Sequence, residues 1–129
     1  MLRSPLQALS AGSVILTLAA GFSLVSTEHA LGLDGSAQRD ARASMTAMEE
    51  FYIRHQTYDA SPAQLARTDP RLRRANVLTA SGTTETYAVS VASRSPEHTV
   101  FTLTRAANGT VTRSCDTPGR SECPASGAW

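Results

Sequence analysis

The two cysteines are the residues whose spacing most clearly indicates chemistry. Cys115 and Cys123 are the only cysteines in the 129-residue chain, and seven residues separate them. Zinc sites use closely spaced Cys and His ligands, and the nearest histidine, His98, does not fit that spacing. We therefore predict a disulfide that closes a short loop rather than a pair of free thiols. Such a bond stabilises by roughly 2–3 kcal/mol and indicates an oxidising compartment.

The titratable side chains form no recognisable catalytic pattern. Glu49 and Glu50 are adjacent, so on a helix they diverge by about 100° and do not make a pair of catalytic carboxylates. His29, His55 and His98 are scattered, and His55 follows an apolar helical face, which favours a core residue over a ligand. The sequence has no Gly-rich phosphate loop, HExxH or GxSxG motif. We expect no enzyme activity, no cofactor and no metal site.

Charge and aromatic content argue against a nucleic-acid partner. The formal net charge is +1 and aromatic residues make up 5% of the chain, so there is neither a strong field nor a set of rings for base stacking. All 12 basic residues are arginine. The run Arg71–Arg74 (RLRR) is interpreted as a solvated loop, with contact to an acidic lipid headgroup or a partner as the alternative.

The N-terminus is apolar. No residue from Ser4 to Thr27 is charged, and the most apolar part, Val14–Val25, has a length typical of a signal-peptide core or a short membrane helix. Signal peptidase prefers small residues at positions −3 and −1, but cleavage before Leu31 places Glu28 at −3. We therefore expect a retained anchor with the rest of the chain outside the membrane. Cleavage and release is the alternative.

This interpretation divides the chain into a hydrophobic anchor, residues 1–30, and an extracytoplasmic head, residues 31–129. Gly32 and Gly35 weaken a helix near residue 33, each by about 1 kcal/mol relative to Ala. Asp34 or Ser36 would then cap a second start.

Beyond these glycines an amphipathic helix is predicted. Six residues recur at spacings of three and four and define one face: Ala37, Ala41, Met45, Met48, Tyr52 and His55. Phe51 flanks that face. We expect Met45, Met48, Phe51 and Tyr52 to form the core between this helix and a sheet.

The second half of the chain predicts a small antiparallel sheet. Ser61-Pro62 is typical of a helix start, and a short helix is expected over 62–68, before Asp69-Pro70. Alternating apolar residues then predict strands. Their expected ranges are 76–80, 85–93, 98–105 and 110–114. Asn108-Gly109 favours a two-residue hairpin, and Trp129 is expected to pack on the domain. The fold class is therefore α+β, with a long N-terminal helix on a β-meander.

The order of these elements resembles the type IV pilin and pseudopilin family. The resemblance rests on the Ala-rich helix with its aromatic pair and Thr-Tyr turn, DGSAQRDARASMTAMEEFYIRHQTYDAS (Asp34–Ser61), and on the cysteine-bearing tail GTVTRSCDTPGRSECPASGAW. It implies a structural subunit, anchored in the membrane by its N-terminal helix, that assembles with itself or other pilin-like subunits by helix packing. It also implies a place in a pilus or a type II secretion system.

The N-terminus departs from the family pattern. Family precursors carry a basic leader that ends in Gly, followed by a mature chain with Glu at its fifth position. After Gly21 the fifth position is Ser26, and Leu6 lies where the glutamate is expected when counted back from Asp34. We expect a divergent member with no evident leader or glutamate. The other hypothesis is an exported or membrane-anchored binding module that does not polymerise.

Overall fold

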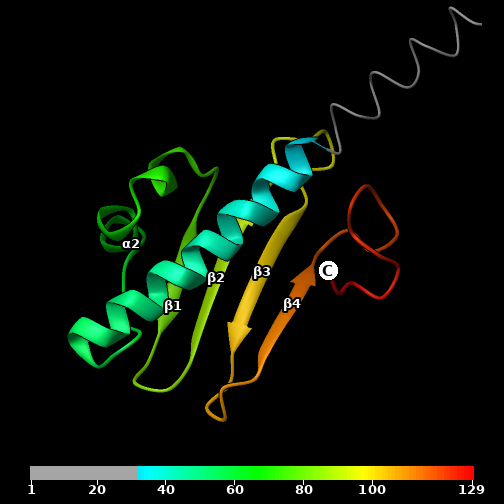
Figure 1. The fold of residues 1–129 in the computed structure, drawn as a ribbon. Coiled ribbons are helices and arrows are strands. Elements are labelled where there is room, and N and C mark those ends of the chain that lie inside the picture. Colours follow the sequence, from blue (N-terminus) through cyan, green and yellow to red (C-terminus); the bar gives the residue numbers. More distant parts are fainter. Residues whose placement is uncertain (1–31) are drawn as a thin grey trace, which may run out of the picture. The chain divides into compact units, whose positions relative to one another are not determined.

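The computed structural model describes residues 32–129, which belong to one compact unit. A long helix runs from residue 32, the first described, to residue 55 and is followed by α2 (Pro62–Thr68) and the 3-10 helix η1 (Pro70–Arg74). The strands are β1 (Thr79–Gly82), β2 (Tyr87–Ala92), β3 (Val100–Arg105) and β4 (Val111–Cys115). They pair antiparallel in the order β1-β2-β3-β4 (Figure 1). The predicted α+β class and meander are confirmed.

One face of the sheet carries the apolar residues. Tyr87, Val89 and Val91 of β2 are buried, and so are Phe101 and Leu103 of β3. The alternating residues on the other face are half-buried and more polar, and their side chains include the hydroxyl pair Ser90–Thr102 at 3.0 Å. The period of two in the sequence is therefore the period of burial, as predicted.

The long helix lies across this apolar face (Figure 1). Its buried residues are Asp34, Ala37, Ala41, Ser44, Ala47, Met48 and Phe51. Small side chains predominate in its first half, where they allow a close approach to neighbouring segments, and the larger Met48 and Phe51 fill the core further along.

The predicted helical face was rotated relative to the buried one. Phe51, predicted at the flank, is buried, whereas Tyr52 is half-buried and His55 is exposed. Ser44 is fully buried and Met45 beside it only half-buried. The hydrophobicity pattern misplaced the buried face because two polar residues, Asp34 and Ser44, lie on it in the folded chain.

The predicted restart of the helix at a cap on Asp34 or Ser36 is wrong. The described helix already includes Gly32 and Gly35, and Asp34 lies within it as a fully buried residue rather than as a cap. Tertiary contacts of Asp34 with the C-terminal region outweigh the helix-weakening effect of the glycines.

The α2 and η1 segment is well capped. Ser61 accepts a hydrogen bond from the amide of Gln64, whose side chain accepts one from the Ser61 amide, and Pro62 is the first helical residue. Asp69 ends α2 and caps η1. The run Arg71–Arg74 is thus not a loop, because the burial of Leu72 holds it as a 3-10 helix.

The strand boundaries differ from the prediction by one to three residues, and only the end of β3 is the same. β1 begins at Thr79, three residues later than expected. The β3–β4 connection spans residues 106–110 rather than two residues, because the amide of Gly109 donates to the carbonyl of Ala106 and Gly109 has φ +88°. The connection is therefore longer than the predicted two-residue turn.

The predicted anchor, Val14–Val25, lies outside the described residues. Within residues 32–129, no helix combines the length and the apolar character needed to cross a membrane.

Candidate functional site

The predicted helix–sheet core residues lie along the joint between the long helix and the sheet. Met48 and Phe51 belong to the buried cluster, together with β2 and β3 residues such as Val89 and Leu103. Met45 and Tyr52 are partly buried and pack against the edge of that cluster. The four residues therefore contribute unequally, with Met48 and Phe51 at the centre.

An aromatic cluster closes one end of the joint. The ring centroid of Tyr58 lies 4.5 Å from that of Tyr52 and 5.0 Å from that of Tyr87. The Tyr58 hydroxyl donates to a Glu49 carboxylate oxygen at 3.0 Å, and the Arg105 guanidinium lies over the Tyr58 ring at 5.2 Å. Burial and the neighbouring Glu49 raise the pKa of Tyr58. These contacts join the loop after the helix to the sheet.

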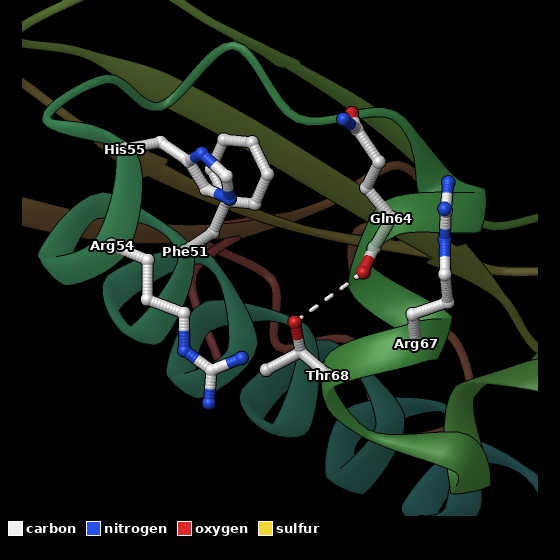
Figure 2. A pocket seen from close by; sticks show the side chains of 6 residues that line it. All are labelled: Phe51, Arg54, His55, Gln64, Arg67 and Thr68. Atoms are coloured by element: carbon white, nitrogen blue, oxygen red, sulfur yellow. Dashed lines mark hydrogen bonds between the residues drawn. The ribbon is translucent and has the colours of Figure 1, made fainter.

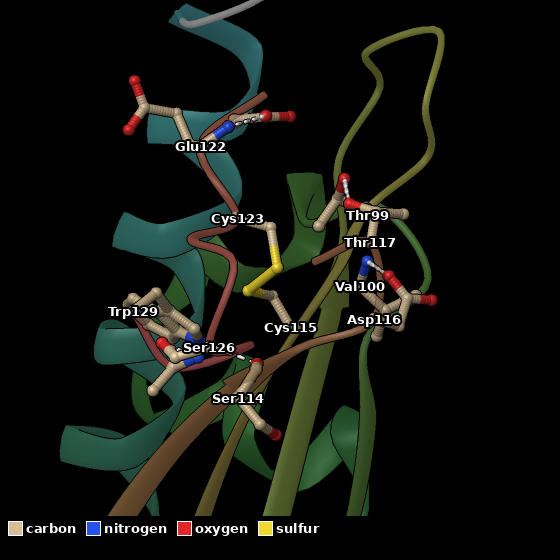
Figure 3. Close-up of a disulfide and its surroundings, with 12 residues drawn as sticks. Thr99, Val100, Ser114, Cys115, Asp116, Thr117, Glu122, Cys123, Ser126 and Trp129 are labelled. Atoms are coloured by element: carbon tan, nitrogen blue, oxygen red, sulfur yellow. Dashed lines mark hydrogen bonds between the residues drawn. A yellow bond between two sulfur atoms is a disulfide. The ribbon is translucent and has the colours of Figure 1, made fainter. Parts of the chain in front are cut away.

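The C-terminal region is joined to the sheet by the predicted disulfide, Cys115–Cys123, which Figure 3 shows. Cys123 is buried, and the Cys115 amide donates to the carbonyl of Gly127 at 2.8 Å. The Trp129 indole donates to the carbonyl of Ser114 at 2.8 Å, and the Trp129 and Phe101 rings pack edge to face with their centroids 5.5 Å apart. The predicted packing of Trp129 is confirmed.

Asp34 connects the long helix with the disulfide loop, and the sequence prediction missed it. Its carboxylate is fully buried and accepts a hydrogen bond from the Glu122 amide at 3.2 Å. Burial raises the pKa of Asp34, but the nearby hydroxyls of Ser121, Ser93 and Ser95 and the hydrogen bond from the Glu122 amide outweigh it and lower the pKa. The sequence position of Asp34 could have indicated its burial, because Asp34 lies three residues before Ala37 and therefore on the same helical face.

Two clefts lie between the long helix and the α2–η1 segment. The first, a cavity of about 240 Å³, is formed by the C-terminal end of the long helix and by α2, and is drawn in Figure 2. Its lining includes Arg54, Arg67 and the exposed His55, whose ring lies 4.2 Å from that of Phe51. His55 therefore faces a cleft rather than the core, which corrects the sequence prediction.

The second cleft, of about 540 Å³, is lined mainly by charged residues. Three segments contribute residues to this cleft: the long helix, η1 and the loop that follows β2. The residues that line it are Ser36, Arg39, Asp40, Pro70, Arg71, Arg74 and Arg94. We call this the arginine cleft.

Local contacts orient three of the four arginines of the arginine cleft. Arg71 makes an ion pair with Asp69 at 2.8 Å, the Arg94 guanidinium donates to the carbonyl of Arg74 at 3.0 Å, and Arg39 donates to the Ser36 hydroxyl at 3.0 Å. No sequence motif indicated this cleft, because its residues are far apart in the chain.

Burial raises the pKa of Asp40, although the positive charges of Arg39, Arg94 and Arg71 act in the opposite direction. No ion pair joins this carboxylate to an arginine within residues 32–129. The cleft thus places one unpaired carboxylate among four guanidinium groups.

Residues 32–129 contain no group of three or more His, Cys, Asp or Glu side chains able to hold a metal ion. The chain matches no protein-family model, and no curated protein or solved structure is significantly similar to it.

Proposed function

We propose that this protein is a pilin-like structural subunit, anchored in the membrane by the segment around Val14–Val25, with residues 31–129 as an extracytoplasmic head. The observation that carries the proposal is the long helix, which follows the apolar segment in sequence and packs on a four-stranded meander. A disulfide-closed C-terminal loop completes the order of elements that the resemblance to type IV pilins and pseudopilins implies.

The helix surface that faces away from the sheet supports assembly by lateral packing. Exposed residues follow one another on it at spacings of three and four: Arg42, Thr46, Glu50 and Ile53. Ile53, which is 73% exposed, adds an apolar side chain to this surface. In an assembled fibre this exposed ridge is the part of the long helix available to a neighbouring subunit, and the head lies outside.

Cysteine cross-linking of the full-length protein in membranes tests the proposal. Both native cysteines are in the disulfide, so an introduced cysteine is the free thiol among the described residues. A short bismaleimide should link neighbouring subunits through Thr46→Cys on the exposed ridge. Thr112→Cys, on the exposed face of β4, is the matched control. Cross-linking at neither position, or equally at both, would contradict assembly through this helix.

The second candidate is an exported or anchored binding module that does not polymerise, and the two clefts beside the long helix favour it. Membrane fractionation with N-terminal sequencing separates the candidates. A membrane-bound chain that retains Val14–Val25 supports the subunit. A soluble chain that begins near Leu31 supports the binding module.

A further inference from the structure

We propose that the arginine cleft is a binding site for a phosphomonoester group, carried either by a small soluble molecule or by a lipid headgroup. The site consists of Arg39, Arg71, Arg74 and Arg94 around Ser36 and Asp40. It is independent of assembly and applies equally to a fibre subunit and to a monomeric module.

The charge of the cleft selects an anion. Four guanidinium groups line it, whereas two carboxylates lie within or beside it, Asp40 in the lining and Asp69 paired with Arg71. The remaining positive charge is concentrated in one concave site, although the net charge of the chain is only +1. A cleft with low-dielectric walls strengthens the attraction of such a cluster for anions.

Three of the four arginines make hydrogen bonds within the protein before a ligand binds. Arg71 is fixed by two side-chain hydrogen bonds to Asp69, Arg94 by one to the Arg74 carbonyl, and Arg39 by one to Ser36. Each guanidinium has five N–H donors, so every one retains donors for a ligand. The Arg74 side chain makes no hydrogen bond or ion pair with residues 32–129 and is free to complete the site. Holding the donors in advance lowers the entropic cost of binding.

The number of donors favours a phosphomonoester over a carboxylate. One guanidinium satisfies both oxygens of a carboxylate, whereas a phosphomonoester offers three acceptor oxygens and a charge near −2 at pH 7. The cavity of about 540 Å³ also leaves room for the alcohol of the ester. Its lining contains no aromatic side chain, so a nucleic-acid base would have nothing to stack on.

Substitution of Asp40 provides a test in which binding of the anion is expected to become tighter rather than weaker. The Asp40 carboxylate lies among the arginines without an ion pair and repels a bound anion. Asp40→Asn keeps the shape of the side chain and removes that repulsion, so it should tighten anion binding. A variant that merely disturbs the fold would weaken it.

Isothermal titration calorimetry on the full-length protein in a nonionic detergent tests the site with three probes. These are inorganic phosphate, glycerol 3-phosphate, and micelles doped with phosphatidic acid, compared with undoped micelles. We expect saturable binding to glycerol 3-phosphate or to the doped micelles. Binding of the soluble ester identifies a free metabolite, whereas binding of the doped micelles alone identifies a lipid headgroup.

Two neighbouring arginines provide matched variants. Arg74→Gln removes a lining guanidinium and should weaken binding about tenfold, the loss typical of one charge-assisted contact. Arg73→Gln makes the same charge change in the same turn of η1 but outside the lining, and should leave binding unchanged. Absence of saturable binding with all three probes, or equal weakening by both variants, overturns the proposal.

Discussion

The carboxylate of Asp34 accepts a hydrogen bond from the amide of Glu122 at 3.2 Å, although 88 residues separate the two in sequence. Asp34 lies on the buried face of the long helix, and Glu122 precedes Cys123 in the disulfide loop. The contact makes the C-terminal loop part of the surface on which the helix rests. The stability of the helix and that of the loop are therefore coupled.

The first prediction concerns the pH dependence of stability. Asp34 has a lowered pKa in the folded protein, so the charged form stabilises the fold above the unfolded-state pKa. That stabilisation is lost as the pH falls below about 4 and through the folded-state pKa. Asp34→Asn should cost about 1–3 kcal/mol at neutral pH and flatten the acid limb of the stability curve.

Thermal unfolding followed by circular dichroism between pH 6 and pH 3 measures this effect. Asp59→Asn, at an exposed position, is the control and should keep the wild-type pH profile. If wild type and Asp34→Asn lose stability in parallel on acidification, the buried carboxylate does not have the role described.

The second prediction concerns the disulfide. Reduction, or the double change Cys115→Ser and Cys123→Ser, should loosen the loop without melting the long helix, because the bond contributes roughly 2–3 kcal/mol to a short loop. Trypsin cleaves after arginine, and Arg120 lies exposed within this loop. We expect cleavage after Arg120 to accelerate about 30-fold on reduction. Cleavage after Arg73 is the internal reference, and equal acceleration at both sites would indicate global unfolding instead.

The third prediction compares two glycines. A Cβ at Gly82 would lie 2.0 Å from the carbonyl oxygen of Tyr58, which is backbone and has little freedom to move. Gly82→Ala should therefore destabilise the protein by about 1–3 kcal/mol. Gly35→Ala meets no atom within 4 Å and should stabilise the helix by about 0.5–1 kcal/mol. Chemical denaturation measures both, and a neutral Gly82→Ala would argue against the close approach of β1 and Tyr58.

The fourth prediction tests which face of the long helix is buried. Met48 is fully buried, so Met48→Ala should cost about 2–5 kcal/mol. Ile53 is 73% exposed, and Ile53→Ala should change stability by less than about 0.5 kcal/mol. The same denaturation experiment applies to both. Comparable losses would mean that the helix packs in a different rotation.

The sheet could be predicted from sequence because its signals are local. Alternation in β2 and β3 specifies which side chains face the core, and the Ser61-Pro62 start of α2 specifies its own capping hydrogen bonds. The predicted disulfide follows from the small number of cysteines and their spacing.

The rotation of the long helix could not be predicted in the same way. A hydrophobicity pattern assigns Asp34 and Ser44 to solvent, yet both are fully buried. One carboxylate oxygen of Asp34 accepts a hydrogen bond from the distant Glu122 amide, and the Ser44 hydroxyl donates to the Asp40 carbonyl of its own helix. The arginine cleft was beyond sequence reasoning for a related reason. Arg39, Arg74 and Arg94 converge only through the tertiary fold.

The aromatic cluster has a spectroscopic consequence. Tyr52, Tyr58 and Tyr87 are the three tyrosines of the chain and lie together near the Arg105 end of β3, while Trp129, the one tryptophan, lies against Phe101 toward the other end. Near-ultraviolet tyrosine dichroism and tryptophan emission therefore report on opposite ends of the same sheet. Loss of one optical signal before the other would reveal which end opens first, without any added label.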